Sequence, residues 1–146
     1  MNKLPISLVL AIILASCSAE LHSSDANTSQ AVNSPETGET AGLQSIRSQE
    51  TKALLAQQPD IVMLDVRTPE EYAAGHLKGA QLINFYSPDF LQRVQALDPA
   101  KTYLVYCAVG GRSKKAVQRM ARLGFKQVYD AAEGFRALQN AGIPTE

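Results

Sequence analysis

The sequence predicts an α/β fold, a three-layer sandwich in which helices flank a central parallel sheet. Short, continuous apolar runs alternate with helix-length segments from about residue 45 to residue 146. Fully buried parallel strands show such runs, and strands separated by helices connect in parallel. The chain of 146 residues is long enough for one domain of this kind.

The predicted elements follow one another in a regular order. A helix over residues 46–57 ends before Pro59, and the apolar run 61–64 is the first strand. Thr68 is the expected N-cap of a second helix, with Pro69 at its first position. The remaining elements are a strand at 80–83, a helix at 88–96, a strand at 102–106, a helix at 113–123 that Gly124 ends, a strand at 128–129 and a helix at 135–140.

Composition excludes several classes of protein. The 14 basic and 14 acidic residues balance, so nothing in the overall charge suggests nucleic-acid binding. The hydrophobic content of 45% is too high for a fully disordered chain. The two cysteines, Cys17 and Cys107, allow one bridge at most, which excludes a disulfide scaffold.

The first 16 residues have the pattern of a secretory signal. Lys3 supplies a positive charge, and residues 4–15 form an apolar run that contains no charged side chain. This run is shorter than the roughly twenty residues that span a bilayer. A buried core helix is the alternative interpretation. Residues 17–44 are rich in small and polar residues, and we expect them to form a flexible tether before a domain at 45–146.

The end of this signal, residues 14–17, resembles the lipobox of bacterial lipoproteins. The resemblance implies cleavage before Cys17 and attachment of lipid to its thiol, which anchors the protein to a membrane. In that family Ser18 is typical of sorting to the outer membrane, so we expect an exported protein that is lipid-anchored to the cell envelope and faces the periplasm. Ordinary signal cleavage nearby, which leaves a soluble secreted protein, is the alternative.

Cys107 is the candidate nucleophile. It follows the strand at 102–106, and ligands of open α/β sheets bind at the carboxyl ends of the strands. Gly110 and Gly111 allow a tight turn, and Ser113 starts a helix whose positive end favours an anion. Such surroundings favour the thiolate. A buried structural cysteine is the alternative.

Basic residues surround this loop. No acidic residue lies between Asp98 and Asp130. Arg112 and Lys114 lie nearest to the loop in sequence and are candidates for contact with an anionic substrate. The seven basic residues are Lys101, Arg112, Lys114, Lys115, Arg119, Arg122 and Lys126. We expect Lys115, Arg119 and Arg122 to form a solvated helix face.

Two motifs carry a resemblance to the rhodanese (sulfurtransferase) family. Cys107-x-x-Gly110-x-Arg112-Ser113 resembles the active-site loop of that family, and residues 64–80 resemble its upstream signature. The resemblance implies transfer of sulfane sulfur from thiosulfate or a similar small anionic donor, through a persulfide on Cys107, to a thiol or cyanide. It implies no metal and no cofactor. The expected substrate-binding residues are Ala108, Val109, Gly110, Gly111, Arg112, Ser113 and Lys114.

The charged residues of the upstream motif are expected to be structural. We expect Asp65 to pair with Arg67, or Arg67 with Glu71, and so to brace the loop. His76 is expected to form a local hydrogen bond.

The chain departs from the family pattern near its C-terminus and after residue 80. Glu133 stands at a family glycine and Leu138 at a family tryptophan, which leaves the packing of the last helix the least predictable part of the fold. Residues 81–88 lack the usual Asn-Ile-Pro, and we expect a different pocket rim there.

Two other functions are compatible with the loop. Cysteine phosphatases, some of which share this fold, also place a cysteine before a helix, but with five residues between cysteine and arginine. Here there are four, residues 108–111. The other alternative is a non-catalytic module that carries a persulfide or recognises a partner.

Overall fold

Five parallel strands form one sheet in the order β1-β5-β4-β2-β3. They were located in a computed structural model, which describes residues 42–146. The signal sequence, Cys17 and the tether up to residue 41 lie outside the described residues. The strands are β1 (Leu43–Ile46), β2 (Val62–Asp65), β3 (Gln81–Leu82), β4 (Thr102–Tyr106) and β5 (Gln127–Ala131).

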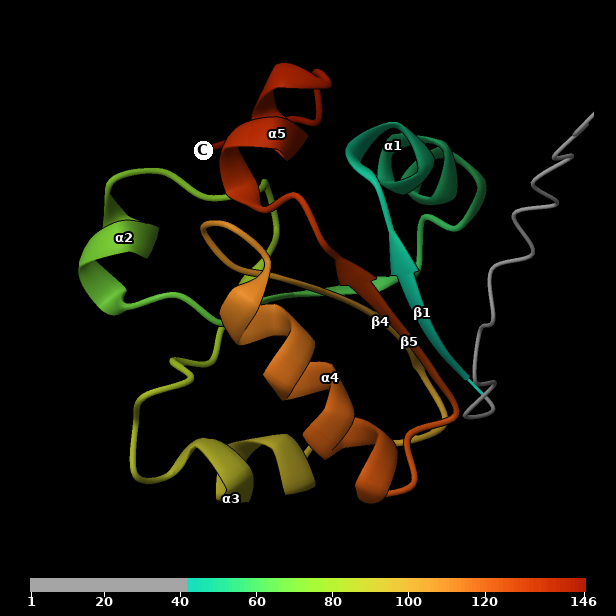
Figure 1. Ribbon diagram of the computed structural model, residues 1–146, viewed down its shortest axis with the longest axis vertical. Helices are drawn as coiled ribbons and strands as arrows, with labels where there is room; N and C mark the ends of the chain where they lie inside the picture. Colours follow the sequence, from blue (N-terminus) through green and yellow to red (C-terminus); the bar gives the residue numbers. More distant parts are fainter. Residues whose placement is uncertain (1–41) are drawn as a thin grey trace, which may run out of the picture. The chain divides into compact units, whose positions relative to one another are not determined.

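Helices cover both faces of this sheet, which confirms the predicted fold class. Figure 1 shows α3 and α4 on one face and α1 and α5 on the other. Val105 and Val117 belong to the core under α3 and α4, whereas Leu104 and Leu138 belong to the core on the opposite face. The helices are α1 (Ser48–Gln57), α2 (Pro69–Ala73), α3 (Phe90–Gln95), α4 (Gly111–Arg122) and α5 (Phe135–Asn140). None of the helices within residues 42–146 is long and apolar enough to span a membrane.

Strand β1 was not predicted from the sequence. The helix expected to start at residue 46 starts at Ser48, and Leu43 and Gln44, which we had assigned to the tether, belong to the strand. Only the two ends of β1 are apolar, and its middle residues are exposed. The strand is defined by its backbone pairing with β5 at the edge of the sheet, and no periodicity in four residues could reveal this pairing.

The last helix is well packed despite the unusual residues around it. Leu138 is fully buried in the core. The Glu133 carboxylate accepts hydrogen bonds from the backbone N–H and the hydroxyl of Ser48, each at 2.7 Å, and from Arg47 Nε at 3.2 Å. Because the first N–H groups of a helix have no partner within it, Glu133 satisfies the start of α1. Glu133, which departs from the family pattern, therefore joins the turn before α5 to the start of α1.

Candidate active site

Cys107 follows strand β4 directly and lies in the interior of the domain. It is 1% exposed, and its Sγ accepts a hydrogen bond from the Gly110 N–H at 3.1 Å. Gly110 has φ of +86°, and a Cβ there would lie 2.0 Å from the Ala132 carbonyl oxygen. Only glycine fits this position, because both the left-handed backbone and the close approach exclude a side chain. The loop that holds the sulfur is therefore fixed by its neighbours.

The N-terminus of α4 points at the sulfur. The helix begins at Gly111, two residues before the predicted start, so Arg112 and Ser113 both belong to its first turn. Burial alone raises the pKa of the Cys107 thiol, but the nearby N–H groups of Ser113, Val109 and Arg112 and the dipole of the nearby Ser113 hydroxyl outweigh it and leave that pKa below its usual value. The site therefore favours a thiolate.

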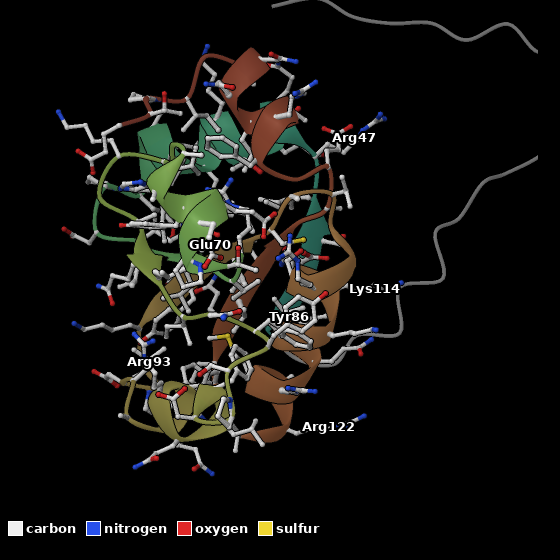
Figure 2. The ribbon with its side chains drawn as sticks, turned by 90° about the vertical axis from the view of Figure 1, so that its left-hand side faces the viewer. Arg47, Glu70, Tyr86, Arg93, Lys114 and Arg122 are labelled. Atoms are coloured by element: carbon white, nitrogen blue, oxygen red, sulfur yellow. The ribbon has the colours of Figure 1, made fainter. Side chains whose placement is uncertain are left out.

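The other loop residues differ widely in exposure. Ser113 is fully buried, and its hydroxyl donates to the Gly110 carbonyl at 3.1 Å. Val109 is 81% exposed at the mouth of the site. Lys114 is exposed, and Figure 2 shows it at the outer edge of α4. Lys114 is not among the residues that line the cavity beside Cys107, and its expected contact with the substrate stays a prediction.

Arg112 forms an ion pair with Glu71. Its two terminal nitrogens lie 2.6 Å and 2.7 Å from the two carboxylate oxygens, a bidentate ion pair. The hydrogen bonds from Arg112 lower the pKa of Glu71 to about 2, so the carboxylate is charged at neutral pH. The positive charge of Arg112, which we expected to attract the substrate, is thus balanced by the negative charge of Glu71. Of the two pairings expected for Arg67, the one with Glu71 does not form, because Glu71 pairs with Arg112.

Asp65 and Arg67 form a second ion pair, and both of its side chains are buried. Arg67 is 4% exposed, and its Nη2 lies 2.6 Å from the Asp65 carboxylate and 2.7 Å from the Gly75 carbonyl oxygen. Its guanidinium also lies 4.1 Å from the centre of the Phe135 ring. The pair therefore ties the end of β2 to the loop after α2 and to the start of α5.

His76 forms local contacts. Its Nδ1 lies 3.1 Å from the Tyr72 carbonyl oxygen, and its ring stacks on the Tyr72 ring at 3.6 Å. Its Nε2 is 3.5 Å from Glu146. His76 is not among the residues that line the cavity beside Cys107.

A cavity of about 550 Å³ opens beside Cys107. Its walls are formed by Thr68, Glu71, Phe85, Tyr86, Cys107, Val109, Gly111, Arg112 and Lys115. This volume is in the range of small-molecule sites, about 300–1,000 Å³. Of the two basic residues in these walls, Arg112 is paired, whereas Lys115 has no ion pair among the described residues.

Three residues of the cavity walls, Phe85 and Tyr86 at its apolar rim and Lys115, were not predicted as site residues. Tyr86 is 67% exposed at the rim (Figure 2). The centre of its ring lies 5.6 Å from the Cζ atom of Arg112. Tyr86 lies in the segment whose departure from the family pattern indicated a different rim. Lys115 was assigned to a solvated helix face. Arg119, assigned to the same face, instead packs over the Phe85 ring at 4.5 Å.

Comparison with known proteins places this geometry in a family. A family model described as "Rhodanese-like domain" matches residues 48–141. Thiosulfate sulfurtransferase 16, chloroplastic, of Arabidopsis thaliana is 37% identical over 93 residues, which are 57% of this chain and 78% of that protein. Thiosulfate sulfurtransferase GlpE of Pseudomonas putida is 33% identical over 93 residues, covering 63% of this chain and 81% of that protein.

Solved structures give the same result. The rhodanese-like domain of the Alr3790 protein from Anabaena sp. matches with a TM-score of 0.62 at 28% identity, over 70% of this chain and 77% of that one. A rhodanese-related protein from Thermoplasma volcanium matches with a TM-score of 0.61 at 28% identity, over 70% of this chain and 97% of that one. The matched region contains the loop from Cys107 to Ser113 and the upstream motif.

Proposed function

This chain belongs to the rhodanese-like domain family, and on that basis we propose that it is a sulfurtransferase that carries sulfane sulfur as a persulfide on Cys107. One observation carries the proposal: the Cys107 sulfur lies beneath the first turn of α4, where backbone N–H groups favour an anion on it. The same N–H groups can stabilise a persulfide anion, whose charge lies one atom further out. The names of its relatives suggest thiosulfate as the donor.

In the first half of the reaction the Cys107 thiolate attacks the outer sulfur of thiosulfate. The S–S bond of thiosulfate breaks, sulfite leaves with the bonding electron pair, and a Cys107 persulfide anion remains. The total charge of the reactants, three negative charges, equals that of the products. No separate base is needed, because the loop lowers the pKa of the Cys107 thiol and so favours the thiolate.

In the second half an acceptor removes the outer sulfur. A thiolate or cyanide ion attacks that sulfur, the S–S bond to Cys107 breaks, and Cys107 leaves as a thiolate. The products are an organic persulfide or thiocyanate. The stabilised Cys107 thiolate is therefore both the nucleophile of the first step and the leaving group of the second.

Lys115 and the N-terminus of α4 supply the attraction for the anionic donor. The charge of Arg112 is balanced by Glu71, so Arg112 adds little net positive charge to the cavity. Its main role is to hold the loop and the cavity wall in place. Lys115 lines the same cavity without such a partner among residues 42–146. We propose that Lys115 is the main side-chain contact to the donor's negative charge.

The test measures sulfur transfer from thiosulfate to cyanide and the intact mass of the protein after exposure to thiosulfate alone. We expect wild-type protein to gain the mass of one sulfur atom and to turn over repeatedly, and Cys107→Ser to do neither. Lys101→Ser is the matched control, because Lys101 is an exposed residue at the opposite end of β4. Full activity of Cys107→Ser would disprove the assignment of the nucleophile.

The same assays separate the two alternatives. A persulfide that forms once but is never passed to a thiol or cyanide would identify a carrier. Hydrolysis of an aryl phosphate faster than transfer from thiosulfate would identify a phosphatase. Either result overturns the proposed activity.

We also propose, from the sequence alone, that the mature protein is exported and anchored to the outer membrane, facing the periplasm, through lipid on Cys17. The basis is the match of residues 14–17 to a lipobox. Two acyl chains give stable anchoring, at about 0.8 kcal/mol per buried methylene. Intact mass of protein purified from membranes should show the lipid, and Cys17→Ser should release the domain into the soluble fraction.

A further inference from the structure

Two exposed apolar side chains flank the mouth of the cavity beside Cys107. Val109 is 81% exposed and Tyr86 is 67% exposed, and both belong to the walls of that cavity. Within residues 42–146 only one other large hydrophobic side chain, Leu91, is exposed. Single exposed apolar residues are common on any protein, but two that flank one nucleophile mark a candidate contact surface. The proposed reaction uses neither of these side chains.

Helix α4 extends a basic surface away from the same mouth. Lys115, in the cavity wall, is followed by Arg119 and Arg122 at helical spacing, so these three share one face of the helix. Lys114, Lys115 and Arg122 are exposed. None of these four basic residues forms an ion pair within the described part of the chain. Figure 2 shows Lys114 and Arg122 extending outward from α4, with Tyr86 in front of the helix.

Little negative charge opposes this basic surface. Glu71 is the one acidic residue in the cavity walls, and its charge is balanced by Arg112. The sequence of α4 contains five basic residues and no acidic residue. Because surfaces of opposite charge attract and select one another, a partner that binds here must present acidic side chains around an apolar centre.

The surface extends further than a small thiol can reach. Arg122 lies seven residues beyond Lys115, which is about 10 Å along the helix axis. Neither Lys114 nor Arg122 lines the cavity, so a thiol held inside the cavity does not contact them. A protein can cover the mouth and the helix together, because a standard interface buries about 800 Å² on each partner. Tyrosine and arginine, which stand here as Tyr86 and Arg122, are enriched in such interfaces.

The burial of Cys107 determines how a protein acceptor reaches the sulfur. Cys107 is 1% exposed, and the outer sulfur of its persulfide lies only about 2 Å from it, the length of an S–S bond. The acceptor must therefore be a cysteine that protrudes from the partner into the cavity. Its thiolate attacks the outer sulfur, the S–S bond breaks with its electron pair on Cys107, and the partner leaves as a persulfide anion. Reactants and products each carry two negative charges.

We propose that this surface docks an acidic protein that carries the acceptor thiol. Val109 and Tyr86 contact apolar residues around the partner's cysteine, and Lys114 and Arg122 pair with carboxylates beside them. The inference rests on the proposed function, because it names the acceptor of the same reaction. It adds that the acceptor is a protein that is recognised outside the cavity, by its charge and by apolar contact.

Sulfur transfer from the persulfidated protein to two synthetic heptapeptides tests this inference. Each peptide has a central cysteine between two leucines, and the outer residues are all glutamate in one peptide and all lysine in the other. We expect Arg122→Glu to lower the second-order rate constant for the glutamate peptide by about tenfold at low salt, and to raise the constant for the lysine peptide. An increase in salt from about 10 mM to about 300 mM should remove most of both changes, because salt screens exposed charges.

Lys52→Glu is the matched control, because it makes the same charge change at an exposed residue of α1, on the opposite face of the sheet (Figure 1). It should leave both peptide rates close to those of the wild type. Transfer to cyanide should be the same in Arg122→Glu and in Lys52→Glu, because cyanide makes no contact outside the cavity. Val109→Ser should lower the rate for the glutamate peptide more than the rate for cyanide, because only the peptide contacts the apolar mouth.

Equal effects of Arg122→Glu and Lys52→Glu on the glutamate peptide overturn the inference. Binding to phosphatidylglycerol vesicles that Arg122→Glu abolishes, with unchanged peptide rates, also overturns it and assigns the basic surface to a membrane. A protein that passes sulfur to cyanide but shows either result loses only the docking surface. A protein that passes sulfur neither to cyanide nor to a peptide loses the proposed function as well.

Discussion

The ion pair between Glu71 and Arg112 gives a quantitative test of how the cavity is held together. Glu71→Gln removes the negative charge but keeps a side chain of the same shape. Glu71 also accepts a hydrogen bond from the Thr68 N–H at 3.0 Å, as part of the capping box of α2. Glutamine serves that role as well, so the substitution isolates the contribution of the ion pair.

The expected loss of stability follows from the pKa of Glu71. The hydrogen bonds and charge of Arg112, together with hydrogen bonds from Thr68, lower this pKa from 4.5 to about 2 despite partial burial. If the whole change counted towards folding, it would equal about 3 kcal/mol. The Glu71 side chain is 34% exposed, so solvent screens part of the interaction. We expect Glu71→Gln to lower the free energy of unfolding by about 1–2 kcal/mol at pH 7.

The pH dependence of this loss is the distinctive part of the prediction. A carboxylate whose pKa is lower in the folded state stabilises the fold above its usual pKa, and this stabilisation disappears as the pH falls through the folded value. Thermal or urea unfolding of wild type and Glu71→Gln should therefore differ most at neutral pH. At pH 3 the difference should be less than half as large. At neutral pH, the Tm should fall by about 4 °C or more.

Glu50→Gln is the matched control for this experiment. Glu50 holds the same capping-box position in α1, where it accepts a hydrogen bond from the Arg47 N–H at 2.7 Å, but it forms no ion pair among residues 42–146. It should lose little stability at any pH. An equal loss in both variants, or a loss in Glu71→Gln that persists unchanged at pH 3, would refute the reasoning.

Three further substitutions test other parts of the site and its support. Gly110→Ala should displace the sulfur-binding loop, because its Cβ would lie 2.0 Å from the Ala132 carbonyl oxygen; alkylation of Cys107 should slow, while circular dichroism shows whether the fold survives. Asp65→Asn leaves Arg67 charged and buried without its partner, and should cost about 3–5 kcal/mol in urea unfolding; a loss under 1 kcal/mol would contradict this. Glu133→Gln should lower the Tm at neutral pH more than at pH 3, because the backbone and hydroxyl hydrogen bonds at the first turn of α1 lower the pKa of Glu133; an unchanged Tm would exclude the capping role.

The sequence predicted the elements whose signals are local. Thr68 caps α2 with Pro69 at its first position, Gly124 follows the end of α4, and α5 spans the predicted residues. These features depend on the backbone preferences of single residues, which act wherever the residue stands. Strand β1 was missed because it depends on a partner, β5, more than eighty residues away in the sequence.

The partners of the charged residues could not be predicted for the same reason. Arg112 was expected to face the substrate, and nothing along the chain indicates that Glu71 takes both of its terminal nitrogens. Lys115 and Arg119 share a helix face, yet one lines the cavity and the other packs on Phe85. A charged side chain can pair with any of several groups, and its partner is fixed only when the folded structure brings one of them close.

The sequence by itself determined the fold class and the loop that holds Cys107, because the strand, the turn glycines and the helix start are contiguous along the chain. Only the tertiary structure decided how charge is distributed around that loop. It placed Glu71 against Arg112, and it placed Lys115 in the cavity wall with no ion pair to any residue within 42–146. Electrostatic interactions depend on distance and burial in space, and these are fixed only when strands and helices that are distant in sequence pack together.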